Sequence, residues 1–370
     1  MNPAEDERLA RISWARLAEP EDPVAWALID KLGLQEALDL VVHGSRRASN
    51  RAVARFAARL QRWDLQQDLA MTDRAGARVL VPGDAEWPDS FAALERPPWC
   101  LWVRGPADLA ALAPRSASVV GSRSATEYGA SVAGDLAAGL GDRGYAVVSG
   151  AAFGIDAAAH RGALAAGAVT VAVLACGVER AYPSAHTGLL REIGETGAIV
   201  SELPPATSAM KMRFLHRNRL IAALTRGTVV VEAGLRSGAL STGRMAARVG
   251  RPVGVVPGPV TSMQSAGCHE AVRQGWATLV TETAEVIELV GAIGTDLADR
   301  KQGPVEPVDE LGTAARQVWG ALPPRASREV EGLARLAGLA EHEVLAGLGE
   351  LDAAGLVEQR LDGWGKVSAR

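Results

Sequence analysis

Gly121, Ser122 and Arg123 form a short turn whose residue types suit the binding of a phosphate group. Glycine lets the backbone approach an anion closely, serine offers a hydroxyl and an amide, and the arginine guanidinium forms paired hydrogen bonds to phosphate oxygens. The turn has neither a Walker lysine nor the G-x-G-x-x-G spacing of dinucleotide enzymes, so nicotinamide binding loses its main support. Alone, the motif is equally compatible with an ordinary strand-to-helix turn.

A second turn, which begins at Ser149 and reaches Asp156, is longer and more specific. Its small residues, Ser149 and Gly150 first among them, keep a crevice open, and Phe153 stands where a nucleobase could stack on its ring. Asp156 and His160 are spaced i, i+4 and therefore face each other on the next helix. We interpret them as a hydrogen-bonded pair rather than a catalytic dyad, because no nucleophile or set of metal ligands accompanies them.

Positive charge is concentrated in one stretch of the chain. Residues 203–269 contain nine basic residues and one acid, Glu232, and so carry +8, whereas the whole chain carries −4 and the remainder therefore −12. This distribution predicts a basic surface for a polyanion, although solvated helix faces are the plainer alternative. Arg217 and Arg219 flank Asn218 at a predicted helix start, which suits contacts to successive phosphates. The candidate contacts in this stretch are Lys211, Arg217, Asn218, Arg219, Arg236, Ser237 and Gly238.

The composition excludes several classes of protein. The N-terminus is acidic and no run of eighteen apolar residues occurs, so we expect a cytoplasmic protein with no membrane contact. Cys100, Cys176 and Cys268 are far apart and no histidine stands at metal-ligand spacing, which argues against disulfides and structural zinc. We predict no catalytic residue, metal or cofactor.

From residue 117 onward, short β-branched runs alternate with helix-length segments, a pattern typical of an α/β domain with a parallel sheet covered on both faces. The predicted strands are 118–120, 146–148, 170–174, 198–200, 228–231 and 253–256. Glycine, serine or proline follows each of them. Because the carboxyl ends of parallel strands form the binding crevice of an open α/β sheet, we expect the turns described above to meet there.

The flanking sequence predicts four further parts. Residues 1–75 are predicted to form a SAM-like helical module, in which one helix opens at Asp22 and ends near Gly33 and another covers residues 51–65. A segment marked by proline and tryptophan is expected to be an adaptor packed on the sheet, and a glycine- and proline-containing stretch a linker. The remaining predicted boundaries are 76–115 for the adaptor, 116–290 for the extended Rossmann-like domain, 291–311 for the linker and 312–370 for a C-terminal domain.

The C-terminal domain is predicted to be a winged helix-turn-helix. Three helices, over 313–321, 327–337 and 341–353, precede a hairpin whose turn is signalled by Asp362-Gly363. The helix that would read duplex DNA in such a domain is acidic, so we expect protein contact or a structural role instead. Its acids are Glu341, Glu343, Glu350 and Asp352.

Residues 119–258 present a succession of motifs in order: Gly-Ser-Arg, Ser-Gly-x-Ala-x-Gly-Ile-Asp with a following His, Tyr-Pro, Ser-Glu-x-Pro, Phe-x-x-Arg-Asn-Arg, Glu-Ala-x-x-x-Ser-Gly-Ala-Leu and Val-Pro-Gly. This succession resembles the DprA/Smf family of DNA-processing proteins, with looser similarity in the parts on either side. The resemblance implies a protein that binds single-stranded DNA, protects incoming strands during natural transformation and helps to load the RecA recombinase, usually as a homodimer.

The resemblance assigns the phosphate contacts most strongly to Ser122 and Arg123 and to the residues 217–219. Two positions depart from the family pattern. Phe153 stands where a basic residue is common, so one backbone contact is missing or exchanged for base stacking. His269 stands where the family commonly has asparagine, and either replaces its hydrogen bond or marks a different edge of the site.

Two other functions remain open on the sequence alone. An enzyme acting on a small nucleotide would release free base and would lose activity on Glu232→Gln, although no pair of carboxylates divides acid and base roles. Glu232 has the plainer interpretation of a hydrogen bond to a neighbouring serine or backbone amide. A protein-interaction adaptor would depend on residues 312–370 and would lose its function, but not oligonucleotide binding, when they are deleted.

Overall fold

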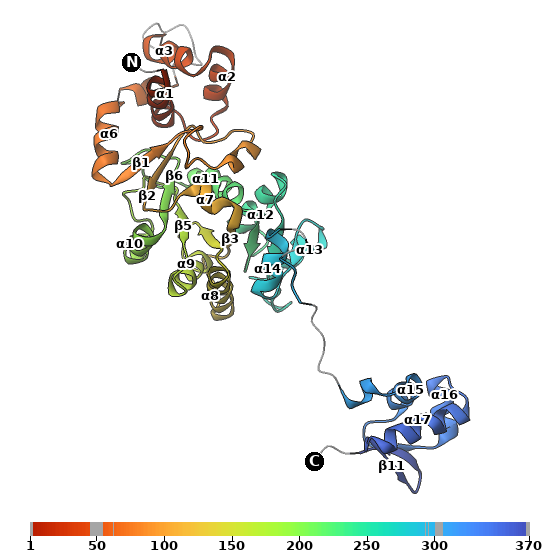
Figure 1. Cartoon of the computed structure of the whole chain (residues 1–370). Helices are drawn as coiled ribbons and strands as arrows, with labels where there is room; N and C mark the ends of the chain where they lie inside the picture. Colours follow the sequence, from red (N-terminus) through yellow and green to blue (C-terminus); the bar gives the residue numbers. More distant parts are fainter. Residues whose placement is uncertain are drawn as a thin grey trace. The chain divides into compact units, whose positions relative to one another are not determined.

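The computed structural model describes residues 3–44, 55–61, 63–292, 294, 296–299 and 306–367, and the chain divides into two compact units, Met1–Ala298 and Asp299–Arg370 (Figure 1). The first unit is built on a nine-stranded sheet in the order β1-β2-β6-β5-β4-β3-β7-β8-β9. Its strands are β1 (Ala77–Leu80), β2 (Leu101–Arg104), β3 (Ser116–Val120), β4 (Ala146–Ser149), β5 (Thr170–Val173), β6 (Ala198–Ser201), β7 (Thr228–Val230), β8 (Val253–Val255) and β9 (Thr278–Leu279).

The parallel core of this sheet contains all six predicted strands, β3 to β8, and ends in the short strand β9. Strand β3 is central: β4, β5 and β6 follow on one side, whereas β7, β8 and β9 follow on the other. The direction of chain progression therefore reverses at β3. In an open α/β sheet such a reversal leaves a crevice at the carboxyl ends of the strands.

The sheet is mixed rather than purely parallel, because the segment expected to be an adaptor contributes two antiparallel strands. Strand β1 pairs with β2, and β2 pairs with β6 through the register Trp102↔Ser201. Trp102 and Val103 are fully buried there. The segment thus packs on the sheet by extending its edge, which covers backbone groups of β6 that would otherwise be an open edge.

Helices cover both faces of the sheet. Neighbouring residues of one strand, such as Val119 and Val120, belong to different apolar clusters because successive side chains of a strand point to opposite faces. One cluster joins the sheet to α11 (Lys211–Leu224), α12 (Gly238–Arg248) and α13 (Ala266–Arg273). The opposite cluster joins it to α8 (Glu127–Asp142), α9 (Ile155–Ala165) and α14 (Thr283–Val290), and α10 (Thr187–Thr196) packs near β6.

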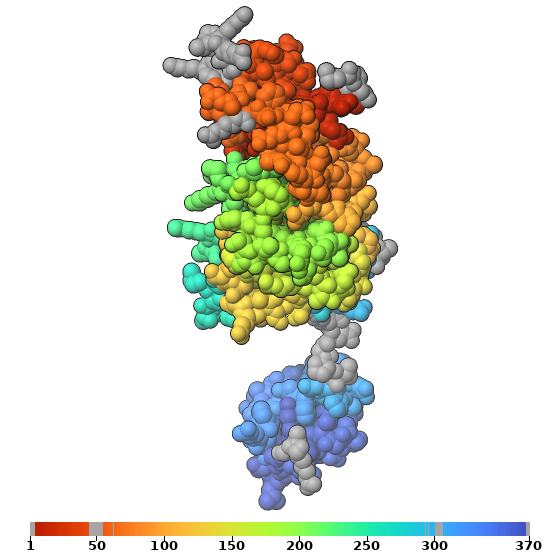
Figure 2. Space-filling model, turned by 90° about the vertical axis from the view of Figure 1, so that its left-hand side faces the viewer, coloured from red at the N-terminus to blue at the C-terminus, as the bar shows by residue number. Residues whose placement is uncertain are grey.

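The N-terminal part is helical, as predicted, with α1 (Pro3–Leu17), α2 (Pro23–Leu32), α3 (Leu34–Gly44), α5 (Ala57–Leu60) and α6 (Leu65–Arg74). Helix α2 begins at the Asp22 cap, whose carboxylate accepts two backbone amides, and ends at Gly33 with φ +82°. Of the helix predicted over 51–65, residues 51–54 and 62 lie outside the described residues. The helices share an aromatic core with Trp99 of the edge segment, and Figure 2 shows them directly against the rest of the unit.

The second unit contains the three helices and the hairpin predicted for it, except that residues 327–328, predicted to begin the second helix, form a short strand. They are α15 (Thr313–Ala321), α16 (Val330–Ala337), α17 (Glu341–Ala353), β11 (Val357–Arg360) and β12 (Gly363–Lys366), to which β10 (Ser327–Arg328) adds a third strand. These elements enclose a small apolar core of their own. Its assignment as a winged helix-turn-helix stays a prediction. The predicted linker lies partly outside the described residues. Among the helices described here, none is long and apolar enough to cross a membrane.

Candidate nucleic-acid interface

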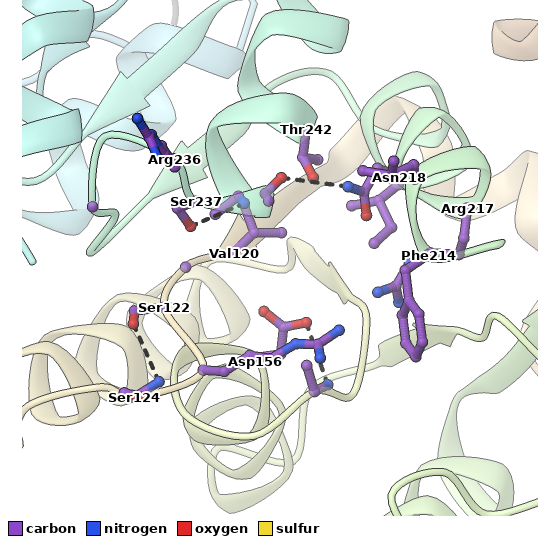
Figure 3. Close-up of a pocket in the computed structure, with 18 of the residues that line it drawn as sticks. Val120, Ser122, Ser124, Asp156, Phe214, Arg217, Asn218, Arg236, Ser237 and Thr242 are labelled. Atoms are coloured by element: carbon purple, nitrogen blue, oxygen red, sulfur yellow. Dashed lines mark hydrogen bonds between the residues drawn. The ribbon is translucent and has the colours of Figure 1, made fainter. Parts of the chain in front are cut away.

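A groove of about 1020 Å³ opens at the carboxyl ends of the strands, where the chain reverses at β3 (Figure 3). Its walls come from the segments after β3, β4, β5, β7 and β8, from α11 and from the start of α12. The candidate residues that line it are Gly121, Ser122, Arg123, Lys211, Arg217, Asn218, Arg236, Ser237 and Gly238. Ser149, Gly150, Phe153 and Arg219 do not line it.

An aromatic side chain links the arginines of the groove. The Arg123 guanidinium lies 4.7 Å from the ring centroid of Phe214, and the Arg217 guanidinium lies 5.9 Å from the same ring. Tyr182 packs against this ring with the centroids 5.6 Å apart. Arg123 is exposed, and no described carboxylate lies within ion-pair distance of it. The cluster therefore offers a cation for a phosphate beside flat apolar surfaces for bases.

Sequence reasoning did not assign Phe214 and Tyr182 to the site. Each lies inside a motif noted in the sequence, Phe-x-x-Arg-Asn-Arg and Tyr-Pro, and only this position could have indicated that they belong to the site. Gln264 was also missed. It comes from the loop after β8 and accepts a hydrogen bond from the Ser122 hydroxyl at 3.1 Å. A helix and two loops that are distant in sequence supply these residues, so only the fold brings them together.

Arg217 forms the buried floor of the groove. Its Nη1 donates to the carbonyl oxygens of Gly150 at 2.8 Å and Val173 at 2.5 Å. Burial lowers the pKa of Arg217 to about 10, although the nearby Asp156 acts in the opposite direction. A Cβ on Gly150 would collide with the guanidinium, so Gly150 makes room for Arg217 and does not itself face the groove. Asn218 beside it donates to the Gly238 carbonyl at 3.3 Å.

Ser122 and Ser149 both form internal hydrogen bonds. The Ser122 amide donates to the Glu232 carbonyl at 2.7 Å, and its hydroxyl accepts the Ser124 amide at 3.1 Å, so the serine shapes the turn that presents Arg123. Ser149 is fully buried and donates its hydroxyl to the Val119 carbonyl at 2.6 Å. This bond joins β4 to β3, and Ser149 is therefore a residue of the sheet rather than of the groove.

Phe153 lies on the turn after β4 but outside the groove lining. Its side chain is 48% exposed and meets the His186 ring edge to face, with the centroids 4.8 Å apart. An exposed aromatic ring on the turn after β4 agrees with the expected stacking surface, whose role in binding stays a prediction.

Arg219 lies on the opposite side of α11 from the groove, which corrects the expectation that it flanks Asn218 toward the same phosphates. Its side chain is 1% exposed, and Nη2 lies 2.5 and 2.6 Å from the two carboxylate oxygens of Glu202. An α-helix turns by about 100° per residue. Arg217 and Arg219 are therefore separated by about 200° around the axis and face different surroundings.

Glu232, the lone acid of the basic stretch, is held by Thr126. One carboxylate oxygen accepts the Thr126 amide at 3.0 Å and the other accepts the Thr126 hydroxyl at 2.6 Å. The side chain is 2% exposed. The interpretation of Glu232 as an acceptor of a backbone amide is confirmed, and both oxygens serve to fasten the turn before α8.

His269 and the cysteines also have structural positions. A ring nitrogen of His269, Nε2, lies 3.0 Å from the Gly258 carbonyl in the Val-Pro-Gly loop. All three cysteines are buried and free. Within the part of the chain that is described, no cluster of histidine, cysteine and acidic residues could hold a metal ion.

Asp156 and His160 do not bond to each other, contrary to the sequence interpretation. Asp156 accepts the amides of Gly150 and Ala152 at 3.2 and 3.3 Å, and burial raises its pKa despite the nearby Arg217. The Nδ1 atom of His160 lies 2.7 Å from the Thr170 hydroxyl. That hydroxyl donates to the Val147 carbonyl at 2.8 Å, so Nδ1 carries a hydrogen, whereas the buried Nε2 has no hydrogen-bond partner among the described residues.

The buried His160 predicts a loss of stability in mild acid. Burial lowers its pKa from 6.5 to about 3, with nearby Arg217 acting in the same direction. Below about pH 6.5 the unfolded chain binds a proton that the folded chain does not, so the free energy of unfolding falls as the pH decreases toward 3. By pH 5 this amounts to about 2 kcal/mol.

We expect His160→Asn, whose amide can replace Nδ1, to remove this contribution. Urea unfolding of the wild type and the variant at pH 7 and pH 5 measures it. The wild type should lose about 2 kcal/mol more than the variant between the two pH values. An identical loss in both proteins would contradict a neutral buried imidazole.

Comparisons with known proteins agree with this geometry. A family model described as DNA recombination-mediator protein A matches residues 78–291, which include β2, the parallel strands and the groove. A putative DNA processing protein DprA of Mycobacterium tuberculosis is 46% identical over 366 residues, 95% of this chain and 93% of the relative. The X-ray structure of DNA processing protein A from Streptococcus pneumoniae matches with a TM-score of 0.65 and 29% identity, over 78% of this chain and 98% of that one.

A fourth similarity concerns ligand binding in a relative. A structure of DNA processing protein A from Helicobacter pylori, described for its unique single-stranded DNA binding mode, matches with a TM-score of 0.52 and 28% identity. The match covers 58% of this chain and 96% of that chain.

Proposed function

Because this chain belongs to the DprA/Smf family of DNA recombination mediators, we propose that it binds single-stranded DNA in the groove at the carboxyl ends of the strands. The observation that carries the proposal is the cluster of Arg123, Phe214 and Arg217, in which one ring separates an exposed cation from a buried one. The cations can bind phosphates and the ring can stack on unpaired bases. Single-stranded DNA presents phosphates and unpaired bases together.

The surroundings of the cluster favour a polymer over a single nucleotide. Lys211 and Arg236 are exposed cations on two different walls of the groove, and Arg123 stands on a third. Cations distributed in this way suit several phosphates along a backbone. Exposed apolar side chains, including Tyr182 and Leu235, line the same groove and suit contacts with bases splayed from the strand.

The proposal extends to the role of the protein in the cell. The protein protects incoming single strands and helps to load the RecA recombinase in natural transformation and recombination, acting as a homodimer in the cytoplasm and without catalysis. The family description as a recombination mediator supports this role. Phe153 is proposed as a further stacking surface for bases.

A competition experiment tests the proposal. The full-length protein is mixed with labelled oligothymidylate and challenged with unlabelled single-stranded or duplex DNA of equal length in a mobility-shift assay. Single strands should compete far better than the duplex, because bases inside a duplex do not expose their faces to Phe214. Equal competition by the two DNAs, or stronger competition by the duplex, would contradict the proposal.

A further inference from the structure

Helix α11 has two functional faces. The face toward the groove carries Lys211, Phe214 and Arg217. The face turned away carries Arg213, His216 and Arg219, which repeat at intervals of three residues. Because the two sets lie on one rigid helix, any rotation or shift of α11 moves the groove residues together with the others.

The face turned away is attached to the N-terminal helices by carboxylates from the turn between α1 and α2. Glu19 bonds Arg213 in a fork, with Nε at 2.9 Å and Nη2 at 2.7 Å. Glu21 lies 2.8 Å from Nδ1 of His216 and 3.4 Å from Nε of Arg219. These interactions join residues about 195 positions apart in sequence, so they connect two parts of the unit rather than neighbouring turns.

The start of α11 lacks the usual means of stabilising a helix end. Its cap residue, Met210, offers no side-chain hydrogen bond, and the first turn contains no acid. Lys211 and Arg213 instead place positive charge where the helix dipole is already positive, which is unfavourable. The Glu19 carboxylate supplies the missing negative charge from outside the helix.

The backbone of the acidic turn is itself constrained. Glu21 has φ +61°, a left-handed backbone conformation that residues other than glycine seldom adopt. Its carbonyl accepts Nη1 of Arg96 at 3.0 Å. The surrounding structure therefore holds this glutamate in a costly conformation that directs its carboxylate at α11.

We propose that Glu19 and Glu21 are positioning residues for the groove, through which the N-terminal helices fix α11 and hence Phe214 and Arg217. This inference rests on the proposed binding of single-stranded DNA. It makes the N-terminal helices part of the binding machinery although none of their described residues lines the groove.

The direction of the effect separates positioning from simple electrostatics. The two carboxylates are 32% and 30% exposed and contact α11, a helix that borders the groove. If they acted only as negative charges near a polyanion, removing them would strengthen DNA binding, because it makes the protein more positive. If they position α11, removing them weakens DNA binding despite the added positive charge.

The test compares two double variants of the full chain that lose the same charge. Glu19→Gln/Glu21→Gln removes the attachment, whereas Glu5→Gln/Glu36→Gln removes exposed carboxylates of α1 and α3. We expect the first to bind oligothymidylate roughly fivefold more weakly than the wild type, since two partly exposed carboxylates no longer pair with the cations of α11, and the second to bind no more weakly. Unchanged or tighter binding by the first variant would overturn the inference.

Hydrogen exchange provides a readout that needs no DNA. Amides of residues 211–219 should exchange faster in the Glu19→Gln/Glu21→Gln variant than in the control variant. Equal protection in both would also overturn the inference. If the wild type failed to bind single strands, the proposed function would fall, while exchange would still decide whether the glutamates hold α11. Should the double variant not fold, Glu21→Gln alone is measured in the same way.

Discussion

Replacing Arg123, Lys211 and Arg236 together with alanine is expected to weaken binding of oligothymidylate by at least about 100-fold. Each side chain is exposed and lines the groove, and each stands on a different segment. A charge-assisted hydrogen bond to a phosphate contributes roughly 1.5–3 kcal/mol, which is about tenfold or more in affinity for each residue. Urea unfolding should be unchanged, because none of the three packs in an apolar core.

The salt dependence of the same variant identifies the cause of the loss. The log–log slope of affinity against salt for single strands is about −0.7 per neutralised phosphate, so the slope should become shallower by about 2. A matched triple variant, in which alanine replaces the exposed Arg161, Arg191 and Arg273 outside the groove, should keep the wild-type slope. Equal losses in the two triple variants would mean that only the overall charge matters.

Arg219→Ala is expected to destabilise the first unit by about 3–5 kcal/mol, because it leaves the buried Glu202 carboxylate without its partner. The guanidinium lies 2.5 and 2.6 Å from the Glu202 oxygens, and both side chains are almost fully buried. Replacing the pair by Arg219→Met with Glu202→Met should recover much of the loss, since no lone charge then remains. Urea unfolding of the three proteins measures the difference.

The binding of DNA distinguishes Arg219 from the groove residues. Where Arg219→Ala remains folded, the salt slope for single strands should equal that of the wild type, because Arg219 neutralises a carboxylate and not a phosphate. A shallower salt slope, with an unchanged free energy of unfolding, would indicate that Arg219 contacts DNA as the sequence predicted.

The sheet and the position of the groove could be predicted because they depend on local patterns. Runs such as Val119-Val120 and Val147-Val148 are β-branched and buried on both faces, and each ends in small residues. Parallel strands bring such ends together whatever the details of the loops. Helix α2 was equally predictable, because its Asp22 cap and terminal Gly33 are local signals.

The remaining features depend on partners that are distant in sequence. Strands β1 and β2 have four residues each, and only the free edge of β6 decides that they extend the sheet. The motif Arg217-Asn218-Arg219 led to the prediction that both arginines face the same phosphates, because closeness in sequence does not show that a helix turns by about 100° per residue. His160 similarly bonds Thr170 on the next strand rather than Asp156 on its own helix, which i, i+4 spacing alone does not reveal.

Photochemical cross-linking of an iodouracil-substituted oligothymidylate to the full chain tests most directly where single-stranded DNA lies. Iodouracil couples on irradiation to aromatic side chains in contact with the base, and the attached peptide identifies the site. The groove described here predicts cross-links at Phe214 and Tyr182, and fewer of them after Arg123→Ala. Cross-links confined to residues 306–367, with the groove aromatics unmodified, would contradict the placement of the strand.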